Sequence, residues 1–271
     1  MNAENKVIAY IHPTAVIHPH AKIGKNVQIG PYAVIDENVE IGDGTKIMPH
    51  AMVTGWTGIG ENCVIYPGAV IGTEPQDLKF KGEKSYVFIG DRTVVRECAT
   101  VHRGCGAESE TRIGDDCLLM AYTHVAHNCV VGNHVIMSNS AMIAGHVVVE
   151  DRVVIGGITG VHQFVRIGRN AMIGGASKLV QDVVPYTIVD VHPAKVSGLN
   201  NVGISRAGIS IDARRNIKKA YKILYRSGLS LSQAIEVIEQ DVESCEEIEH
   251  FLRFLRNAER GICRTRKENV E

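Results

Sequence analysis

The sequence predicts a mainly β chain built as a solenoid of short stacked strands, followed by an α-helical region. Three observations support this prediction: a six-residue hydrophobic period starting at Ile11, glycine and proline at fixed offsets within each period, and helical spacing of apolar residues near the C-terminus. We therefore expect one domain over residues 1–190, with inserted loops near residues 73–88 and 102–112, and a helical domain over residues 191–271.

The six-residue period is the strongest signal in the chain. Of the 29 positions reached by steps of six from Ile11 to Leu179, 26 hold Ile, Val, Leu or Met. The three exceptions lie within the two polar segments near 73–88 and 102–112 that we interpret as loops. They are Asp77, Glu83 and Ala107. Loops on a rigid scaffold often carry function, although surface excursions without function fit these segments equally well.

Each period has the composition of a short strand followed by a corner. The residue two before the large apolar one is small or β-branched, as at Ala33, and the residue after it is often glycine, as at Gly30. The next position is proline five times, and glycine and proline at fixed offsets are typical of turns. A six-residue unit cannot bury its one large side chain alone, whereas stacked units can.

This pattern resembles the hexapeptide-repeat family. The resemblance implies a left-handed parallel β-helix of triangular section, in which three hexads form an 18-residue coil and residues 8–190 form about ten coils. The hand is implied by the resemblance alone, because parallel crossovers are ordinarily right-handed.

Apolar residues follow helical spacing in the C-terminal region. The three apolar stripes contain Ile217, Ala220, Tyr221 and Leu224; Leu231, Ile235, Ile238 and Val242; and Ile248, Phe251, Leu252 and Leu255. Ser230 with Gln233, and Ser244 with Glu247, predict capping boxes. Segment 206–226 contains seven basic residues and one acidic residue, which fits a solvated face or, with Arg166 and Arg169, a dock for an acidic partner.

Composition excludes several classes of protein. The 271 residues are 45% apolar with a formal net charge of −1, which argues against a general nucleic-acid binder. No run of 18 apolar residues predicts a membrane span, and the N-terminus lacks the features of a signal peptide. The seven cysteines form no CxxC pair, so we expect reduced thiols in a cytoplasmic protein.

Four of the twelve histidines gather at one edge of the predicted solenoid, over three consecutive coils. They are His124, His127, His146 and His162. Reducing positions by the 18-residue coil stacks Gly145 on His127 and Gln163 on Gly145, while the inward column stays aliphatic. A single surface histidine is usually a bystander, but four at one edge indicate a site.

Two kinds of chemistry fit this histidine edge. The spacing of His124 and His127 resembles that of metal ligands. Alternatively, a histidine with its ordinary pKa of about 6.5 suits removal of a proton from a hydroxyl group at neutral pH. No serine or cysteine at this edge has an obvious nucleophilic role, which favours direct transfer over a covalent intermediate.

The segments around these histidines resemble the UDP-N-acetylglucosamine acyltransferase family, which begins lipid A biosynthesis. The matching segments are AYTHVAHNCVVG, NSAMIAGHVVVEDRVVIGG, TGVHQFVRIG, QDLKF, ATVHRG and AYKILYRSG. The resemblance implies a cytoplasmic homotrimer that moves an (R)-3-hydroxyacyl chain from acyl carrier protein to the sugar 3-hydroxyl. It implies no metal or redox cofactor, because the acyl group arrives on the phosphopantetheine of the carrier.

The resemblance also implies roles for individual residues. His127 matches the general base, and the backbone N–H of Gly145 matches the oxyanion donor. Residues matching substrate contacts are Asp77, Lys79, His124, His146, His162, Gln163, Asn200 and Arg206, with Asp77 and Lys79 serving the neighbouring subunit. Residues matching the determinants of acyl length are Gly175, His192 and Met172. Because a glycine leaves space for a ligand, we expect an acyl chain on the order of 12–16 carbons.

Three positions depart from the family pattern, and several alternatives stay open. Asn128 follows the base where an aspartate is frequent, and it can accept a hydrogen bond but brings no charge. Val202 and Ala207 stand where related enzymes often hold charged nucleotide contacts. The alternatives are N-acyl transfer to a 3-amino UDP-sugar, a zinc-dependent hexapeptide-repeat hydrolyase, and a purely structural β-helix. The related lipid A N-acyltransferase carries an extra N-terminal uridine-binding domain, for which hexads beginning by Ile11 leave no room.

Overall fold

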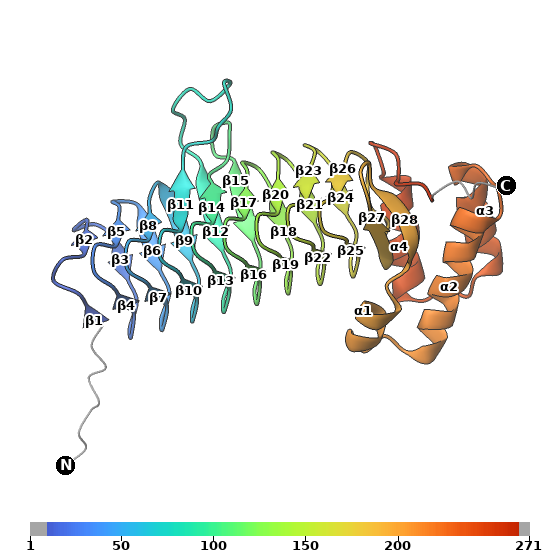
Figure 1. Cartoon of the computed structure of the whole chain (residues 1–271), viewed down its shortest axis with the longest axis horizontal. Coiled ribbons are helices and arrows are strands. Elements are labelled where there is room, and N and C mark those ends of the chain that lie inside the picture. Colours follow the sequence, from blue (N-terminus) through green and yellow to red (C-terminus); the bar gives the residue numbers. More distant parts are fainter. Residues whose placement is uncertain (1–9, 266–271) are drawn as a thin grey trace, which may run out of the picture.

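The computed structural model describes residues 10–265 as a triangular prism of three β-sheets with helices at its C-terminal end (Figure 1). The first sheet contains β1 (Tyr10–Ile11), β4 (Gln28–Ile29), β7 (Lys46–Ile47), β10 (Val64–Ile65), β13 (Val94–Val95), β16 (Leu118–Leu119), β19 (Ile136–Met137), β22 (Val154–Ile155), β25 (Met172–Ile173), β27 (Thr187–Asp190) and β28 (Lys195–Leu199). The second contains β2 (Val16–Ile17), β5 (Val34–Ile35), β8 (Met52–Val53), β11 (Val70–Thr73), β14 (Thr100–His102), β17 (His124–Val125), β20 (Met142–Ile143), β23 (Gly160–Val161) and β26 (Lys178–Leu179). The third contains β3 (Lys22–Ile23), β6 (Val39–Ile41), β9 (Trp56–Ile59), β12 (Tyr86–Ile89), β15 (Glu110–Ile113), β18 (Val130–Val131), β21 (Val148–Val149) and β24 (Arg166–Ile167).

The register confirms the 18-residue coil. Ile29 pairs in parallel with Ile47, and Ile47 with Ile65, so each strand contacts the strand one coil further along the chain. The repeated aliphatic side chains point into the prism, where Ile29, Ile47 and Ile65 are at most 1% exposed. The residue before each of them points outward. The six-residue period therefore arises because every strand contributes one large side chain to a continuous core.

The two inserted loops explain the three exceptions to the period. Val64 pairs with Val94, thirty positions on, and Val94 pairs with Leu118, twenty-four positions on, where an uninterrupted coil needs eighteen. The first insertion therefore adds two hexads and the second adds one. The six-residue period continues in the same phase after each loop. Both loops leave the prism between the second and third sheets, after β11 and after β14, where Figure 1 shows them projecting together.

The C-terminal region differs from the prediction in two details. The sheet continues past residue 190, because β28 runs antiparallel to β27 as a hairpin that does not follow the hexad pattern. The helices that follow are α1 (Asn201–Arg206), α2 (Ile211–Arg226), α3 (Leu231–Asp241) and α4 (Glu246–Arg256), and the three apolar stripes fall on α2, α3 and α4. The capping box at Ser230 is present. The one predicted at Ser244 is wrong, because Cys245 is the N-cap of α4 and the Ser244 hydroxyl donates to Glu249 instead.

Helix α4 is attached to the prism by ionic and aromatic contacts. Nε2 of His250 lies 2.8 Å from a Glu150 carboxylate oxygen. The Arg166 guanidinium lies 4.7 Å from the ring centre of Phe254, and Arg169 pairs with Glu246 at 3.1 Å. Both arginines are therefore engaged within the chain. Within residues 10–265, no helix is long and apolar enough to cross a membrane.

Strand β4 offers a direct test of the role of the inward column. Ile29 is fully buried, whereas its neighbour Gln28 on the same strand is exposed. We expect Ile29→Ala to lower the free energy of unfolding by about 2–5 kcal/mol, because it leaves a cavity between two coils. Gln28→Ala is the matched control and should change it by less than about 0.5 kcal/mol. Urea unfolding followed by circular dichroism measures both, and equal effects would contradict the inward column as the source of stability.

Candidate active site

The predicted histidine edge is the corner between the second and third sheets. His127 follows β17, and the next coils place Gly145 and Gln163 at the same position of the repeat. The stacking is direct: the amide of His146 donates to the carbonyl of His127 at 3.0 Å, and the amide of Phe164 donates to the carbonyl of Gly145 at 3.2 Å. The inserted loops leave the same edge one to two coils earlier, so they reach over it.

A cavity of about 910 Å³ lies between this edge and the first inserted loop. The predicted site residues that line it are Asp77, Lys79, His124, His127, Gly145, His162 and Gln163. Outward side chains of the second sheet, including Met142 on β20, and the backbone at Gly160 on β23 continue the cavity along the prism. The cavity therefore combines a cluster of polar groups with a partly apolar floor.

Hydrogen bonds determine which nitrogen of His127 carries the proton. The backbone N–H of Cys105 can only donate, and it donates to Oδ1 of Asn128 at 2.9 Å. This bond orients the amide, so the same Oδ1 faces Nδ1 of His127 at 2.8 Å and must accept from it. Nδ1 therefore carries the proton, and the lone pair of the neutral ring is on Nε2. Nε2 lies 3.5 Å from a carboxylate oxygen of Asp77.

Asp77 contacts His127 of its own chain, and its predicted role towards the substrate of a neighbouring subunit stays a prediction. The loop that carries it folds back over the edge from which it leaves. The carboxylate is close enough to stabilise a positive charge on the His127 ring when that ring takes up a proton.

Gly145 is needed at its position for two reasons. A Cβ atom there would lie 2.5 Å from Cε1 and 2.6 Å from Nε2 of His127, so any side chain would displace the ring. Gly145 also occupies the hexad position at which proline recurs in other coils. The backbone amide at this position forms no hydrogen bond in the strand ladder. Within residues 10–265, no acceptor bonds the Gly145 amide. At other corners the equivalent amide binds a side-chain oxygen, as Lys25 does with Asp43 at 2.7 Å.

His102 belongs to this site and was missed from the sequence. It is 5% exposed, lines the cavity, and its ring lies edge-on to that of His124 at 4.7 Å. Burial, together with the charges of His124 and His127, lowers the pKa of His102 to about 4. Burial likewise lowers the pKa of His124, whose Nδ1 contacts the Thr100 hydroxyl at 2.7 Å. Both rings are therefore neutral at physiological pH.

The remaining predicted residues lie outside the cavity within this chain. His146 lies beside it, edge-on to His127 at 5.3 Å and stacked on Phe164. Asn200 is buried and caps α1, where its Oδ1 accepts from the amide of Gly203 and its Nδ2 donates to the carbonyl of Asn170. Arg206 is the last residue of α1.

The three residues predicted to set acyl length lie at a different part of the prism. Met172 and Gly175 lie on and after β25, at the corner between the first and second sheets, and His192 lies in the hairpin between β27 and β28. All three are exposed. They could meet the His127 cavity only if a second subunit supplied them.

The donor groups at this edge do not favour a zinc centre of three histidines. In the chain from 10 to 265, the group at the cavity with ligand atoms close enough for an ion is Asp77, Cys105 and His127. Burial and the nearby carboxylate of Asp77 raise the pKa of the Cys105 thiol, which disfavours the thiolate that a metal requires. In addition, Oδ1 of Asn128 accepts a hydrogen bond from Nδ1 of His127 and orients the ring. An imidazole oriented in this way is suited to act as a general base.

The fold and this cavity define the chain as a hexapeptide-repeat transferase of the left-handed β-helix type. A model described as "Bacterial transferase hexapeptide (six repeats)" matches residues 8–37, 38–73 and 110–145, and one described as "Udp N-acetylglucosamine O-acyltransferase; Domain 2" matches residues 182–263. The chain belongs to the UDP-N-acetylglucosamine O-acyltransferase family.

Individual relatives support this assignment over nearly the whole chain. An acyl-[acyl-carrier-protein]–UDP-N-acetylglucosamine O-acyltransferase of Anaeromyxobacter dehalogenans is 45% identical over 94% of this chain and 99% of its own. The solved UDP-N-acetylglucosamine acyltransferase of Bacteroides fragilis is 45% identical, with a TM-score of 0.91 over 94% of this chain and all of its own. The LpxA structure from Acinetobacter baumannii is 42% identical, with a TM-score of 0.90 over 94% of this chain and 99% of its own.

The environment of His102 predicts an unusual titration. Because the ring is buried beside two other histidines, it should take up a proton only near pH 4. Side-chain NMR of the imidazole carbons would follow this titration, and His102→Asn would assign the resonance by removing it. A midpoint near the ordinary value of about 6.5 would show that water reaches the ring and would contradict its burial.

Proposed function

We propose that this chain transfers an (R)-3-hydroxyacyl group from acyl carrier protein to the 3-hydroxyl of UDP-N-acetylglucosamine, as an acyl-[acyl-carrier-protein]–UDP-N-acetylglucosamine O-acyltransferase in the first step of lipid A biosynthesis. One observation supports it above the others: the Nε2 lone pair of His127 lies at the cavity next to Gly145, whose amide has no acceptor within residues 10–265. A base and an oxyanion donor in adjacent coils suit acyl transfer to a hydroxyl group. The names of the relatives agree with this chemistry.

In the proposed mechanism, Nε2 of His127 removes the proton of the sugar 3-hydroxyl as its oxygen attacks the thioester carbonyl. The carbonyl oxygen becomes negative and accepts a hydrogen bond from the Gly145 amide, a contact typically worth about 3 kcal/mol. The tetrahedral intermediate then collapses, the carbon–sulfur bond breaks, and the proton on His127 passes to the departing phosphopantetheine thiol. The acyl group arrives already activated as a thioester, so this sequence uses no redox cofactor.

Residues around the base would position the two substrates. Asn128 holds the ring of His127 in the required tautomer through a hydrogen bond of 2.8 Å. Asp77 and Lys79 on the first inserted loop line the cavity and would contact the sugar. His124, His162 and Gln163 would add polar contacts, while the outward face of β20 and β23 offers an apolar surface to the acyl chain.

We further propose that the active unit is a homotrimer whose sites lie between subunits. Exposed apolar corners support a partner surface: Tyr122 is 64% and Ile158 is 72% exposed. Both have a positive φ, as residues at this position of the repeat commonly do, and this conformation is unfavourable for a β-branched residue such as Ile158. A neighbouring subunit would also bring Gly175, Met172 and His192 of its own chain towards this cavity. Asn200 and Arg206 would reach the nucleotide in the same way.

The basic segment 206–226 is our candidate surface for the acidic carrier protein. Lys218, Lys222 and Arg226 border a hollow of about 610 Å³ on α2. Arg166 and Arg169 do not belong to this surface, because they are engaged with Glu150 and Glu246.

Acyl transfer from a panel of (R)-3-hydroxyacyl carrier proteins tests the proposed reaction. We expect the wild type to acylate UDP-N-acetylglucosamine, with a preference for chains on the order of 12–16 carbons because Gly175 leaves space. His127→Ala should reduce transfer at least about a hundredfold, since a general base commonly contributes 10²–10⁴.

Circular dichroism would show that the His127→Ala variant keeps its fold. Full activity in that variant would favour a purely structural role for the histidine edge. A wild type that acylates only a 3-amino UDP-sugar would replace O-acyl with N-acyl transfer, and failure with both acceptors would contradict the acyltransferase.

The contact between Gly145 and His127 gives a second prediction. Gly145→Ala should lower kcat by about a hundredfold or more, because its Cβ would push the imidazole out of line with the substrate hydroxyl. Gly198→Ala on β28 is the matched control, since a Cβ there meets nothing within 4 Å, and it should retain activity. Equal activity of the two variants would show that the His127 ring does not require its position over Gly145.

A further inference from the structure

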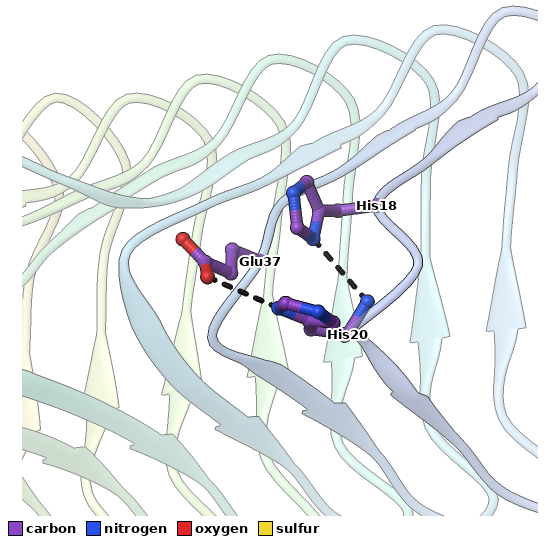
Figure 2. A group of neighbouring side chains, drawn as sticks. All are labelled: His18, His20 and Glu37. Carbon is purple, nitrogen blue, oxygen red and sulfur yellow. Dashed lines mark hydrogen bonds and ion pairs between the residues drawn. The ribbon is translucent and has the colours of Figure 1, made fainter.

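A second cluster of potential ligands lies at the N-terminal end of the same edge, far from the His127 cavity. His18 and His20 belong to the corner after β2, and Glu37 belongs to the corner one coil later, after β5. Figure 2 shows the three side chains turned towards one another. Each offers one ligand atom, and these atoms all lie within 4.8 Å of one another.

We propose that His18, His20 and Glu37 form a site for a zinc-type divalent cation that joins the first coil to the second. Two imidazoles and a carboxylate with an open fourth position are a ligand set that Zn²⁺ commonly uses in proteins. The hexad pattern does not account for these side chains, because the repeat specifies no histidine or glutamate at these positions. The reaction proposed above does not use them either.

The spacing of His20 and Glu37 fits two ligands better than a strong ion pair. Nδ1 of His20 lies 3.2 Å from Oε1 of Glu37. Charge-assisted hydrogen bonds are shorter, at about 2.7–2.9 Å. Two ligand atoms, each about 2.0–2.1 Å from a tetrahedral zinc ion, are about 3.3 Å apart. These two atoms are therefore already at the spacing that an ion between them needs.

His18 can complete the set with a small movement. Its Nδ1 accepts a 3.2 Å hydrogen bond from the backbone amide of His20, and an ion bound through this nitrogen would replace that bond. The His18 and His20 rings are in edge-to-face contact, with their centres 5.1 Å apart at 73°, so both rings belong to one cluster. The His20 and Glu37 side chains are 73% and 51% exposed, so they can rotate and an ion can enter directly from solvent.

The neighbouring carboxylate of Asp36 adds negative charge to the site. The Thr54 hydroxyl donates to one carboxylate oxygen of Asp36 at 2.6 Å, and the backbone amide of Glu37 donates to the other at 2.9 Å. A carboxylate fixed next to Glu37 in this way would favour a cation at the cluster.

A cation here would reinforce the end of the solenoid. Among the coils described in residues 10–265, the first has a neighbouring coil on one side and its inward side chains are the least covered, with Ile11 44% exposed against 0% for Ile29. End coils of repeat proteins need additional stabilisation because they lack one neighbour. Ligands from both coils would fasten the first coil to the second.

Titration calorimetry of Zn²⁺ into untagged, chelator-treated protein tests the site. We expect one equivalent per chain, weakened more than tenfold in His20→Ala and in Glu37→Gln. His134→Ala is the matched control, because His134 also faces a carboxylate, Asp116 at 3.9 Å, but belongs to neither of the potential metal-binding groups found in residues 10–265. That variant should bind as the wild type does.

The absorption spectrum of bound Co²⁺ distinguishes this site from the group of potential ligands at the His127 cavity. A His18–His20–Glu37 complex has only nitrogen and oxygen ligands, whereas a complex that includes Cys105 would show thiolate-to-cobalt charge transfer. We expect a spectrum without charge transfer that is unchanged in Cys105→Ser and lost in His20→Ala. No saturable binding, binding unaffected by His20→Ala and Glu37→Gln, or binding lost only in Cys105→Ser would overturn the proposal.

Discussion

Everything in this protein depends on the stacking of one large aliphatic side chain per hexad on its equivalent one coil away. Because Ile29, Ile47 and Ile65 occupy equivalent places in successive coils, the backbone must return to the same point every eighteen residues. Insertions of whole hexads are tolerated, since they leave the register unchanged. The corners are therefore repeated in space as regularly as the core, and a residue's number determines the edge on which it lies.

The active site uses a feature of those corners that lack proline. At the position of the repeat where proline recurs, any other residue has an amide that does not enter the strand ladder and can bind an oxygen. Lys25 binds the side chain of Asp43 in this way, and Asn133 binds that of Asp151. At Gly145 the same amide has no such partner within the described chain, residues 10–265, and the His127 ring lies beside it. A structural hydrogen-bond donor of the repeat is thus available to stabilise a developing negative charge.

From the sequence alone, we could predict those parts of the site that lie in uninterrupted coils, where counting in steps of eighteen residues gives each position. His127 and Gly145 are eighteen residues apart with no insertion between them, so their stacking followed directly from their numbers. His102 was not predicted because the second loop adds six residues between it and His124. When this inserted hexad is taken into account, His102 occupies the same position of the coil as Ala126, Ala144 and His162. The contact between Asp77 and His127 could not be derived in this way, since a loop outside the ladder has no period. The hairpin of β27 and β28 was missed for the same reason.

The substitution of asparagine for aspartate beside the base is compensated by the surrounding structure. Orientation does not require a charge here, because the amide of Cys105 fixes Oδ1 of Asn128 and thereby the proton on Nδ1 of His127. The negative charge that would stabilise the imidazolium is supplied from the opposite side of the ring, by Asp77 at 3.5 Å from Nε2. A sugar hydroxyl that donates to Nε2 would therefore approach the base beside the Asp77 carboxylate. The inserted loop therefore contributes to the proposed chemistry as well as covering the site, and two extra hexads in the sequence are what place it there.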